Sequence, residues 1–176
     1  MYKNSLCGSI SSEIGSVSSL IYLHLAYNKL SGFIPSEAGL LSSLVYVNLK
    51  KNELTASIPS EVGLLSSLYS VNMRDNQLSG SIPSEVGVLS NLNRFYLHHN
   101  LLSGSIPSEI GLLRKMEWLY FNVMSSIPSN IGLLSSLKSI YLESNSLNGT
   151  IPPEVCRLFN SGWSISVVDI NMENNC

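Results

Sequence analysis

The sequence predicts an α/β solenoid, a fold in which similar coils of chain stack along one axis. Proline and glycine recur along the chain at a step of 24 residues, with a single step of 21. The prolines of this series are Pro35, Pro59, Pro83, Pro107, Pro128 and Pro152, and the glycines are Gly39, Gly63, Gly87, Gly111 and Gly132. Apolar residues make up 44% of the chain and charged residues only 12%, which suits a continuous apolar core.

About five complete units of 24 residues, with partial units at both ends, fill residues 1–176. We therefore expect a single repeat domain without a linker. Residues 4–11 align with the second half of a unit, so the chain starts within a repeat and we expect a fragment of a longer protein. The fifth unit is three residues short and lacks the asparagine that the other units share.

The first half of each unit predicts a strand followed by an inward turn. The alternation of Leu23 and Leu25 is typical of a strand with one buried face. An asparagine follows, and its amide can both donate and accept hydrogen bonds, so stacked asparagines can satisfy buried turn groups. This Asn ladder is expected to comprise Asn28, Asn52, Asn76, Asn100 and Asn145.

The second half of each unit predicts a bend and a short helical turn. In the Leu-Ser-Gly step, as at residues 30–32, the glycine tolerates a positive φ. The following proline is expected to open the helical turn, with Ser and Glu in its first positions. We expect the glycine two residues after this Glu to end the turn. The Leu-Leu or Val-Leu pair that follows is expected to face the core.

The complete unit, L-x-x-L-x-L-x-x-N-x-L-S-G-x-I-P-x-E-x-G-x-L-x-x-L, resembles the plant-type leucine-rich repeat. This family includes ectodomains of plant receptor-like kinases and receptor-like proteins, polygalacturonase inhibitors and algal leucine-rich-repeat proteins. The resemblance implies a right-handed superhelix with a parallel concave sheet, short second strands on one flank and short 3-10 turns on the convex side. It further implies a non-catalytic protein that recognises proteins, peptides or glycans, located outside the cell or at the cell surface.

Composition and motifs argue against several other functions. A sequence pI near 5.9 disfavours binding of nucleic acid through phosphate neutralisation. No apolar run approaches the roughly 18 residues of a membrane span, and no signal peptide follows Met1. The sequence carries none of the common catalytic or phosphate-binding motifs, so we expect no enzyme activity and no cofactor. Neither the His98-His99 pair nor the repeated Glu predicts a metal site.

The remaining candidate is a recognition surface on the concave face. Aromatic and Arg side chains, which are enriched at binding hot spots, gather on the fourth to sixth units beside a basic strip. The alternative is that strands simply favour Tyr and Trp. The basic strip favours an acidic or anionic ligand, and we expect the protein to be a monomer. The predicted partner-binding residues are Tyr22, His24, Tyr46, Asn48, Lys50, Lys51, Arg74, Arg94, Tyr96, His98, Trp118, Tyr120 and Tyr141.

Two other functions remain compatible with the sequence. A secreted inhibitor of a cell-wall-degrading enzyme would use the same concave face. An ice-binding or other surface-adsorbing protein would use a column of small polar residues on one flank, but Phe33 interrupts that column and serine suits it poorly.

The three cysteines and one sequon lead to further expectations. Cys156 stands at the glycine position of the last unit, near a predicted final strand at residues 165–170. In an oxidising compartment we expect a Cys156–Cys176 disulfide to hold that strand, leaving Cys7 unpaired. Asn148 begins the sequence Asn-Gly-Thr and is a glycosylation candidate if the protein is secreted.

Overall fold

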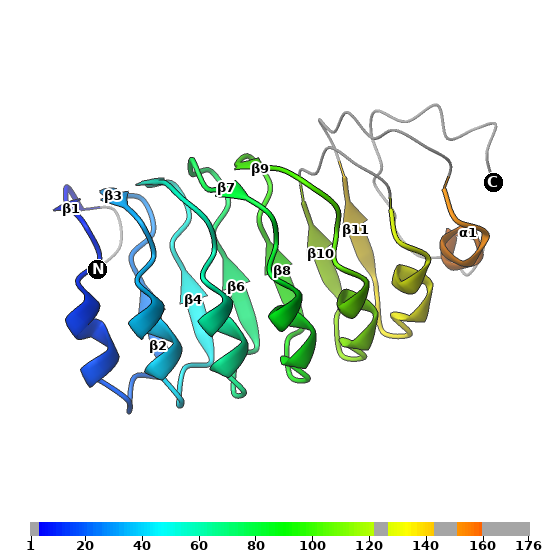
Figure 1. Cartoon of the computed structure of the whole chain (residues 1–176), viewed down its shortest axis with the longest axis horizontal. Helices are drawn as coiled ribbons and strands as arrows, with labels where there is room; N and C mark the ends of the chain where they lie inside the picture. Colours follow the sequence, from blue (N-terminus) through cyan, green and yellow to red (C-terminus); the bar gives the residue numbers. More distant parts are fainter. Residues whose placement is uncertain (1–3, 122–126, 143–150, 160–176) are drawn as a thin grey trace.

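The computed structural model of the chain describes residues 4–121, 127–142 and 151–159. Within these ranges each predicted unit forms one coil, and the coils stack side by side along the long axis of the molecule (Figure 1). A parallel sheet lies on one side of the stack and a row of short helices lies on the other. The predicted solenoid is therefore confirmed. Its buried side chains form one continuous cluster, which extends from Ile10 to Val155.

The first strands of successive coils form one six-stranded parallel sheet in the order β11-β10-β8-β6-β4-β2. Its strands are β2 (Tyr22–His24), β4 (Tyr46–Asn48), β6 (Ser70–Asn72), β8 (Arg94–Tyr96), β10 (Trp118–Tyr120) and β11 (Ser139–Tyr141). The register pairs equivalent positions of neighbouring units, such as Asn72 and Tyr96. Strand alternation turns the central residue of each strand toward the core, and its two neighbours point outward.

Short second strands lie along one flank, in a sheet of order β1-β3-β5 and a separate pair, β7-β9. They are β1 (Cys7–Gly8), β3 (Lys29–Gly32), β5 (Glu53–Leu54), β7 (Ser79–Gly80) and β9 (Leu101–Leu102). Gly32, Gly80 and Gly104 adopt positive φ angles of 75–80°, as the Leu-Ser-Gly step predicts. Ala56 occupies the same position in the third coil and has a φ of 63°.

We expect the substitution Ala56→Gly to stabilise the protein. A left-handed φ costs a residue with a Cβ about 1–2 kcal/mol, whereas the added freedom of an unfolded glycine costs about 0.4–1 kcal/mol. The net gain should be about 0.5–1 kcal/mol in the free energy of unfolding, measured by urea denaturation. The control Thr55→Gly, at a neighbouring exposed position without a positive φ, should be destabilising. A destabilised Ala56→Gly variant would contradict this account of the flank.

On the opposite side of the stack, each coil carries a five-residue 3-10 helix. These are η1 (Ser12–Ser16), η2 (Ser36–Leu40), η3 (Ser60–Leu64), η4 (Ser84–Val88), η5 (Ser108–Leu112) and η6 (Ser129–Leu133). From η2 to η6 a proline with φ between −63° and −71° occupies the N-cap, so its fixed φ prepares the helical turn. The last coil has an α-helix instead, α1 (Pro153–Phe159).

The glycine of each short helix does not end the helix, which corrects one prediction. In η4 the helix continues beyond Gly87 to Val88. A Cβ on Gly87 would lie 2.5 Å from the Cβ of Glu109 and 2.8 Å from its carbonyl oxygen. Glycine is needed there because successive helices touch, and it therefore sets how closely the coils stack on this side.

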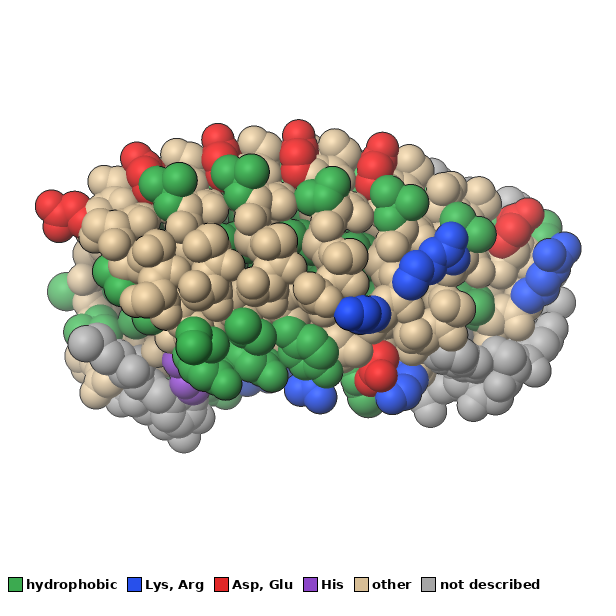
Figure 2. All heavy atoms as spheres, turned by 90° about the horizontal axis from the view of Figure 1, so that it is seen from below, with side chains coloured by type: hydrophobic (Ala, Val, Ile, Leu, Met, Phe, Trp, Pro, Cys, Tyr) green, Lys and Arg blue, Asp and Glu red, His purple; other side chains and the backbone are tan. Residues whose placement is uncertain are grey.

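Only the second residue of each Leu-Leu or Val-Leu pair faces the core, which corrects another prediction. Leu64 is 62% exposed, whereas Leu65 is 3% exposed. With three residues per turn of a 3-10 helix, adjacent side chains point about 120° apart, so both cannot face inward. Figure 2 shows hydrophobic side chains in a row beside the row of acidic side chains. The exposed residues at this position are Leu40, Leu64, Val88, Leu112 and Leu133.

The Asn ladder connects each coil to the one before it. The side-chain nitrogen of Asn76 donates to the carbonyl of Met73 in its own turn and to that of Leu49 in the preceding coil, both at 3.0 Å. Its side-chain oxygen accepts a hydrogen bond from the backbone N–H of Leu54 at 3.1 Å. The same acceptor role toward the preceding coil recurs at Asn28, Asn52 and Asn100.

Several predicted features fall outside the described residues. These are the ladder residue Asn145, the sequon at Asn148, the predicted final strand at residues 165–170, the proposed disulfide partner Cys176 and residues 122–126 of the short fifth unit. Cys156 is disulfide-bonded, and Cys7 is an exposed free thiol. Among the helices of the described ranges, none has the length and apolar character needed to cross a membrane.

Candidate functional site

The outward side of the six-stranded sheet, here named the concave face, carries the predicted partner-binding residues. Equivalent positions of successive coils lie side by side, so these residues form columns across the strands. The first column contains Tyr22, Tyr46, Arg94 and Trp118, and the second contains His24, Asn48, Tyr96, Tyr120 and Tyr141. Lys50, Arg74 and His98 follow the strands two residues later, and Lys51 is the next residue after Lys50.

Two tyrosines stack at the N-terminal end of the concave face. The rings of Tyr22 and Tyr46 are nearly parallel, with centroids 5.0 Å apart, and Tyr22 is 64% exposed. Tyr69 meets Tyr46 edge to face at 5.7 Å, and the guanidinium carbon of Arg94 lies 6.0 Å from the centroid of Tyr69. This arrangement leaves two flat rings available to a ligand on a rigid sheet.

A larger group of rings, here named the aromatic cluster, lies toward the C-terminal strands. Tyr120 is at its centre, with its ring centroid 5.0 Å from that of Tyr96, 5.4 Å from that of Tyr141 and 6.5 Å from that of Trp118. His98 completes the cluster, 5.7 Å from the ring of Tyr120. Burial raises the pKa of the Tyr96 phenol, so this group stays protonated at neutral pH.

Between the two aromatic groups the concave face is hollowed, with a cavity volume of about 390 Å³. Its floor is low at Ser70 on β6, because the neighbouring strands carry the larger Tyr46 and Arg94 at this position. At the other outward position, Asn72 lies between Asn48 and Tyr96. Arg94 also lines the hollow, as do Asn48 and Tyr96. A hollow of this kind offers amide and guanidinium donors between apolar rings.

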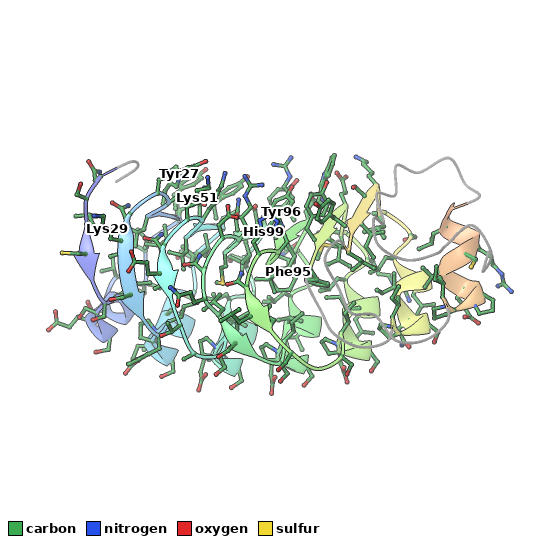
Figure 3. All side chains as sticks on the ribbon, turned by 90° about the horizontal axis from the view of Figure 1, so that it is seen from above. Tyr27, Lys29, Lys51, Phe95, Tyr96 and His99 are labelled. Carbon is green, nitrogen blue, oxygen red and sulfur yellow. The ribbon has the colours of Figure 1, made fainter. Side chains whose placement is uncertain are left out.

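Cationic side chains follow the ends of the strands. The ammonium of Lys50 donates a hydrogen bond of 2.6 Å to the hydroxyl of Tyr27, and the ammonium of Lys51 lies 5.5 Å from the centroid of that ring. The hydrogen bond from Lys50 is the main cause that lowers the pKa of Tyr27. Figure 3 shows Tyr27, Lys51, Tyr96 and His99 on the side opposite the short helices.

The next coils add an ion pair to this edge. The carboxylate of Asp75 lies 2.8 Å from Nδ1 of His99 and 3.6 Å from Nε of Arg74. We name the combined group, which comprises Lys50, Lys51, Arg74, Asp75 and His99, the cationic rim. Its single carboxylate leaves the rim with an excess of positive charge.

His98 differs from the prediction that it is an exposed binding residue. It is only 5% exposed, because the rings of Tyr120 and Tyr141 both lie 5.7 Å from its ring. Burial, together with the nearby charges of His99 and Arg74, lowers the pKa of His98 to about 4. The residue is therefore neutral at pH 7 and lies beneath the surface of the concave face.

Four residues of this surface were not among the predicted binding residues: Tyr27, Tyr69, Asp75 and His99. Tyr27, Asp75 and His99 each stand immediately before a ladder asparagine and have φ near 58°, as Lys51 does in its coil. Their position relative to the Asn ladder is the sequence signal that could have identified them. No comparable signal marks Tyr69, which precedes its strand.

The surface is suited to recognition through stacking, hydrogen bonding and charge. Within the described residues, no group of three His, Cys, Asp or Glu side chains converges as a metal site would require. Aromatic rings on a rigid scaffold provide contact area with little loss of side-chain entropy, and the rim favours a ligand that carries negative charge.

Comparisons with known proteins agree with the geometry. The family model described as Leucine Rich Repeat matches residues 19–41, 67–89, 91–113 and 136–158, which together cover just over half of the chain. No match was found among curated protein sequences.

Solved structures of plant receptors resemble most of the chain. The plant peptide hormone receptor RGFR1, solved in complex with RGF2, is 34% identical over 95% of this chain, with a TM-score of 0.90. The ectodomain of GASSHO1/SCHENGEN3 from Arabidopsis thaliana, solved with CASPARIAN STRIP INTEGRITY FACTOR 2, is 35% identical over 95%, with a TM-score of 0.85. The ectodomain of Arabidopsis HAESA, solved with an IDA peptide hormone, is 34% identical over 90%, with a TM-score of 0.83. The chain spans only 20–28% of the length of these three structures.

Proposed function

Because this chain belongs to the leucine-rich-repeat family, we propose that it is a non-catalytic recognition module that binds an anionic peptide on its concave face. The similar receptor ectodomains were solved with peptide hormones bound, which favours a peptide over a glycan. Because these proteins are receptor ectodomains, we also propose that the module works outside the cell.

The aromatic cluster is the observation that carries this proposal. Tyr96, Trp118 and Tyr120 are only half-buried, and they point away from the core because they flank the buried centres of their strands. Half-exposed rings held by neighbouring rings are rigid, so a ligand that covers them gains apolar contact without ordering them. Beside them, the hollow and the cationic rim supply the donors and the positive charge that an acidic peptide would need.

We expect Trp118→Ala to weaken peptide binding by about 30-fold, which corresponds to a loss of about 2 kcal/mol at a hot spot. The ligand for the test is a peptide selected from a displayed random library against the unmodified protein, and its Kd is measured by isothermal titration calorimetry. The free energy of unfolding should change much less, because the side chain is not part of the buried core.

The matched control is Glu85→Ala, an exposed change on the helical side of the stack that should leave the Kd unchanged. If Trp118→Ala also leaves the Kd unchanged, the selected peptide binds elsewhere and the concave face is not the site. The same conclusion follows if the library yields only peptides whose binding is lost in Glu85→Ala.

A further inference from the structure

Two buried nitrogen atoms beside the concave face have no hydrogen-bond partner among the described residues: Nε of Arg74 and Nδ1 of His98. Buried polar atoms are normally paired, so two orphans close together require an explanation. Arg74 and His98 each follow their strand by two residues, and Asn72 and Tyr96 at the strand ends are paired in register. Adjacent strands lie about 4.8 Å apart, so Arg74 and His98 occupy equivalent positions on neighbouring coils.

The surroundings of His98 hold more positive than negative charge. Lys50 and Arg74 act on its imidazole from the two preceding coils, and His99 follows it with a ring centroid 4.9 Å away. Within the part of the chain that the structure describes, Asp75 is the only carboxylate among the charged groups that act on His98, and it already contacts His99 at 2.8 Å. Its distance of 3.6 Å from Nε of Arg74 is too long for a hydrogen bond.

The remaining neighbours of His98 are phenols. Tyr96 on β8, Tyr120 on β10 and Tyr141 on β11 lie with ring centroids 5.7–6.5 Å from the imidazole. Phenols stay neutral at the pH values at which an imidazole titrates, so they bury the ring without balancing a charge on it. A proton on His98 is therefore opposed both by burial and by the cations of the rim.

We propose that Arg74, together with Lys50, forms a subsite for an anionic group of the ligand, and that occupation of this subsite favours protonation of His98 by solvent. The proposal rests on the proposed function, and it specifies where the negative charge of the ligand lies. One N–H bond forms, at the ring nitrogen that holds the free lone pair, and every bond of the ligand stays intact. Carboxylates, sulfate esters and phosphate esters share the required chemistry.

The linkage follows from charge balance. Without a ligand, burial and the neighbouring cations hold the pKa of His98 at about 4. An anion at Arg74 cancels part of the repulsion, so the protonated imidazole becomes easier to form and the pKa rises. Because binding linkage is reciprocal, the protein must bind the anion more tightly as the pH falls toward the range in which His98 titrates.

The test uses sodium sulfate, whose dianion does not change protonation in this pH range. NMR follows the ring carbon and proton signals of His98 as the pH is lowered, in sulfate and in sodium chloride of equal ionic strength. We expect sulfate to raise the midpoint of the titration by about one pH unit. Calorimetry at pH 5, in buffers with different ionisation enthalpies, should then show an uptake of roughly 0.4 proton for each sulfate bound.

Three variants separate the subsite from a general salt effect. Arg74→Gln should abolish the sulfate-dependent shift, and Lys50→Gln, a second change at the rim, should reduce it. Arg114→Gln, which removes an exposed cation whose side chain contacts the last turn of η6, should retain the full shift. An unchanged midpoint in sulfate, or a shift that persists in Arg74→Gln, would overturn the proposal.

Methyl sulfate and trifluoroacetate, neither of which changes protonation in this pH range, then distinguish a sulfate ester from a carboxylate as the group that fills the subsite. These outcomes are independent of the peptide test. Loss of peptide binding in Trp118→Ala, combined with no effect of any anion on His98, would leave the concave face as the peptide site and eliminate only the anion subsite. The opposite pair of results would eliminate the peptide proposal alone.

Discussion

Asn76→Ala is expected to lower the free energy of unfolding by about 2–3 kcal/mol. The change removes the bonds to the carbonyls of Leu49 and Met73 and the bond accepted from the N–H of Leu54. Asn76 is only 9% exposed, so water cannot easily replace these partners. The N–H of Leu54 is left without its partner, at a cost of about 1–3 kcal/mol, whereas the two carbonyls each lose one hydrogen bond but still accept another, from Asn52 and Asn100. Urea denaturation followed by circular dichroism measures the loss.

The control for this prediction is Gln77→Ala, at the exposed position next to Asn76. An exposed side chain away from a cap or a buried network normally contributes less than about 0.5 kcal/mol, so the control should unfold like the unmodified protein. Equal stability of the two variants would mean that water satisfies the turn groups and that the Asn ladder is not a structural requirement.

A marked loss of stability between pH 6.5 and pH 4 is the second large effect that we expect. The folded state lowers the pKa of His98 from 6.5 to about 4, so in this range the unfolded chain binds a proton that the folded chain does not. The stability that comes from this difference is fully present above pH 6.5 and is lost as the pH falls toward 4. The difference between the two pKa values corresponds to about 3 kcal/mol.

The contribution of His98 can be separated from that of the carboxyl groups by the slope of the free energy of unfolding against pH. At pH 5 the histidine contributes a slope of about 1.2 kcal/mol per pH unit, which His98→Gln should remove. His24→Gln removes an exposed histidine from the same face and should keep the original slope. If the slopes of His98→Gln and the unmodified protein coincide, His98 is already protonated in the folded protein at that pH.

Sequence periodicity predicts where the short helices and turns lie better than it predicts which individual side chains are buried. The prolines and the Leu-Ser-Gly steps act through local backbone preferences, so they locate the short helices and most of the flank turns correctly. Periodicity alone does not distinguish a glycine that ends a helix from a glycine that allows close packing, and Gly87 is of the second kind. Only the structure shows Glu109 against it.

The candidate site shows a similar division. Strand alternation indicates correctly that Tyr96 and Trp118 point outward. It makes the same statement for His98, which is nevertheless covered by aromatic rings from two later strands. Such covering depends on the side-chain directions of other units, and a pattern within one unit does not contain that information. By contrast, the ion pair between Asp75 and His99 joins equivalent positions one repeat of 24 residues apart, so the periodicity could have indicated it.

The direction of the Asn ladder has a consequence for how the protein is made. Each ladder asparagine that the structure describes accepts from a backbone N–H of the coil before it, as Asn52 does from Leu30 and Asn100 does from Leu78. During synthesis from the N-terminus, the newest coil on a growing stack therefore keeps an unsatisfied N–H until the next coil emerges from the ribosome. Each coil is completed only by the coil that follows it, so we expect the coils to assemble in the order in which they are translated. If the ribosome stalls, the last coil made would keep its unpaired backbone N–H at the growing end of the stack.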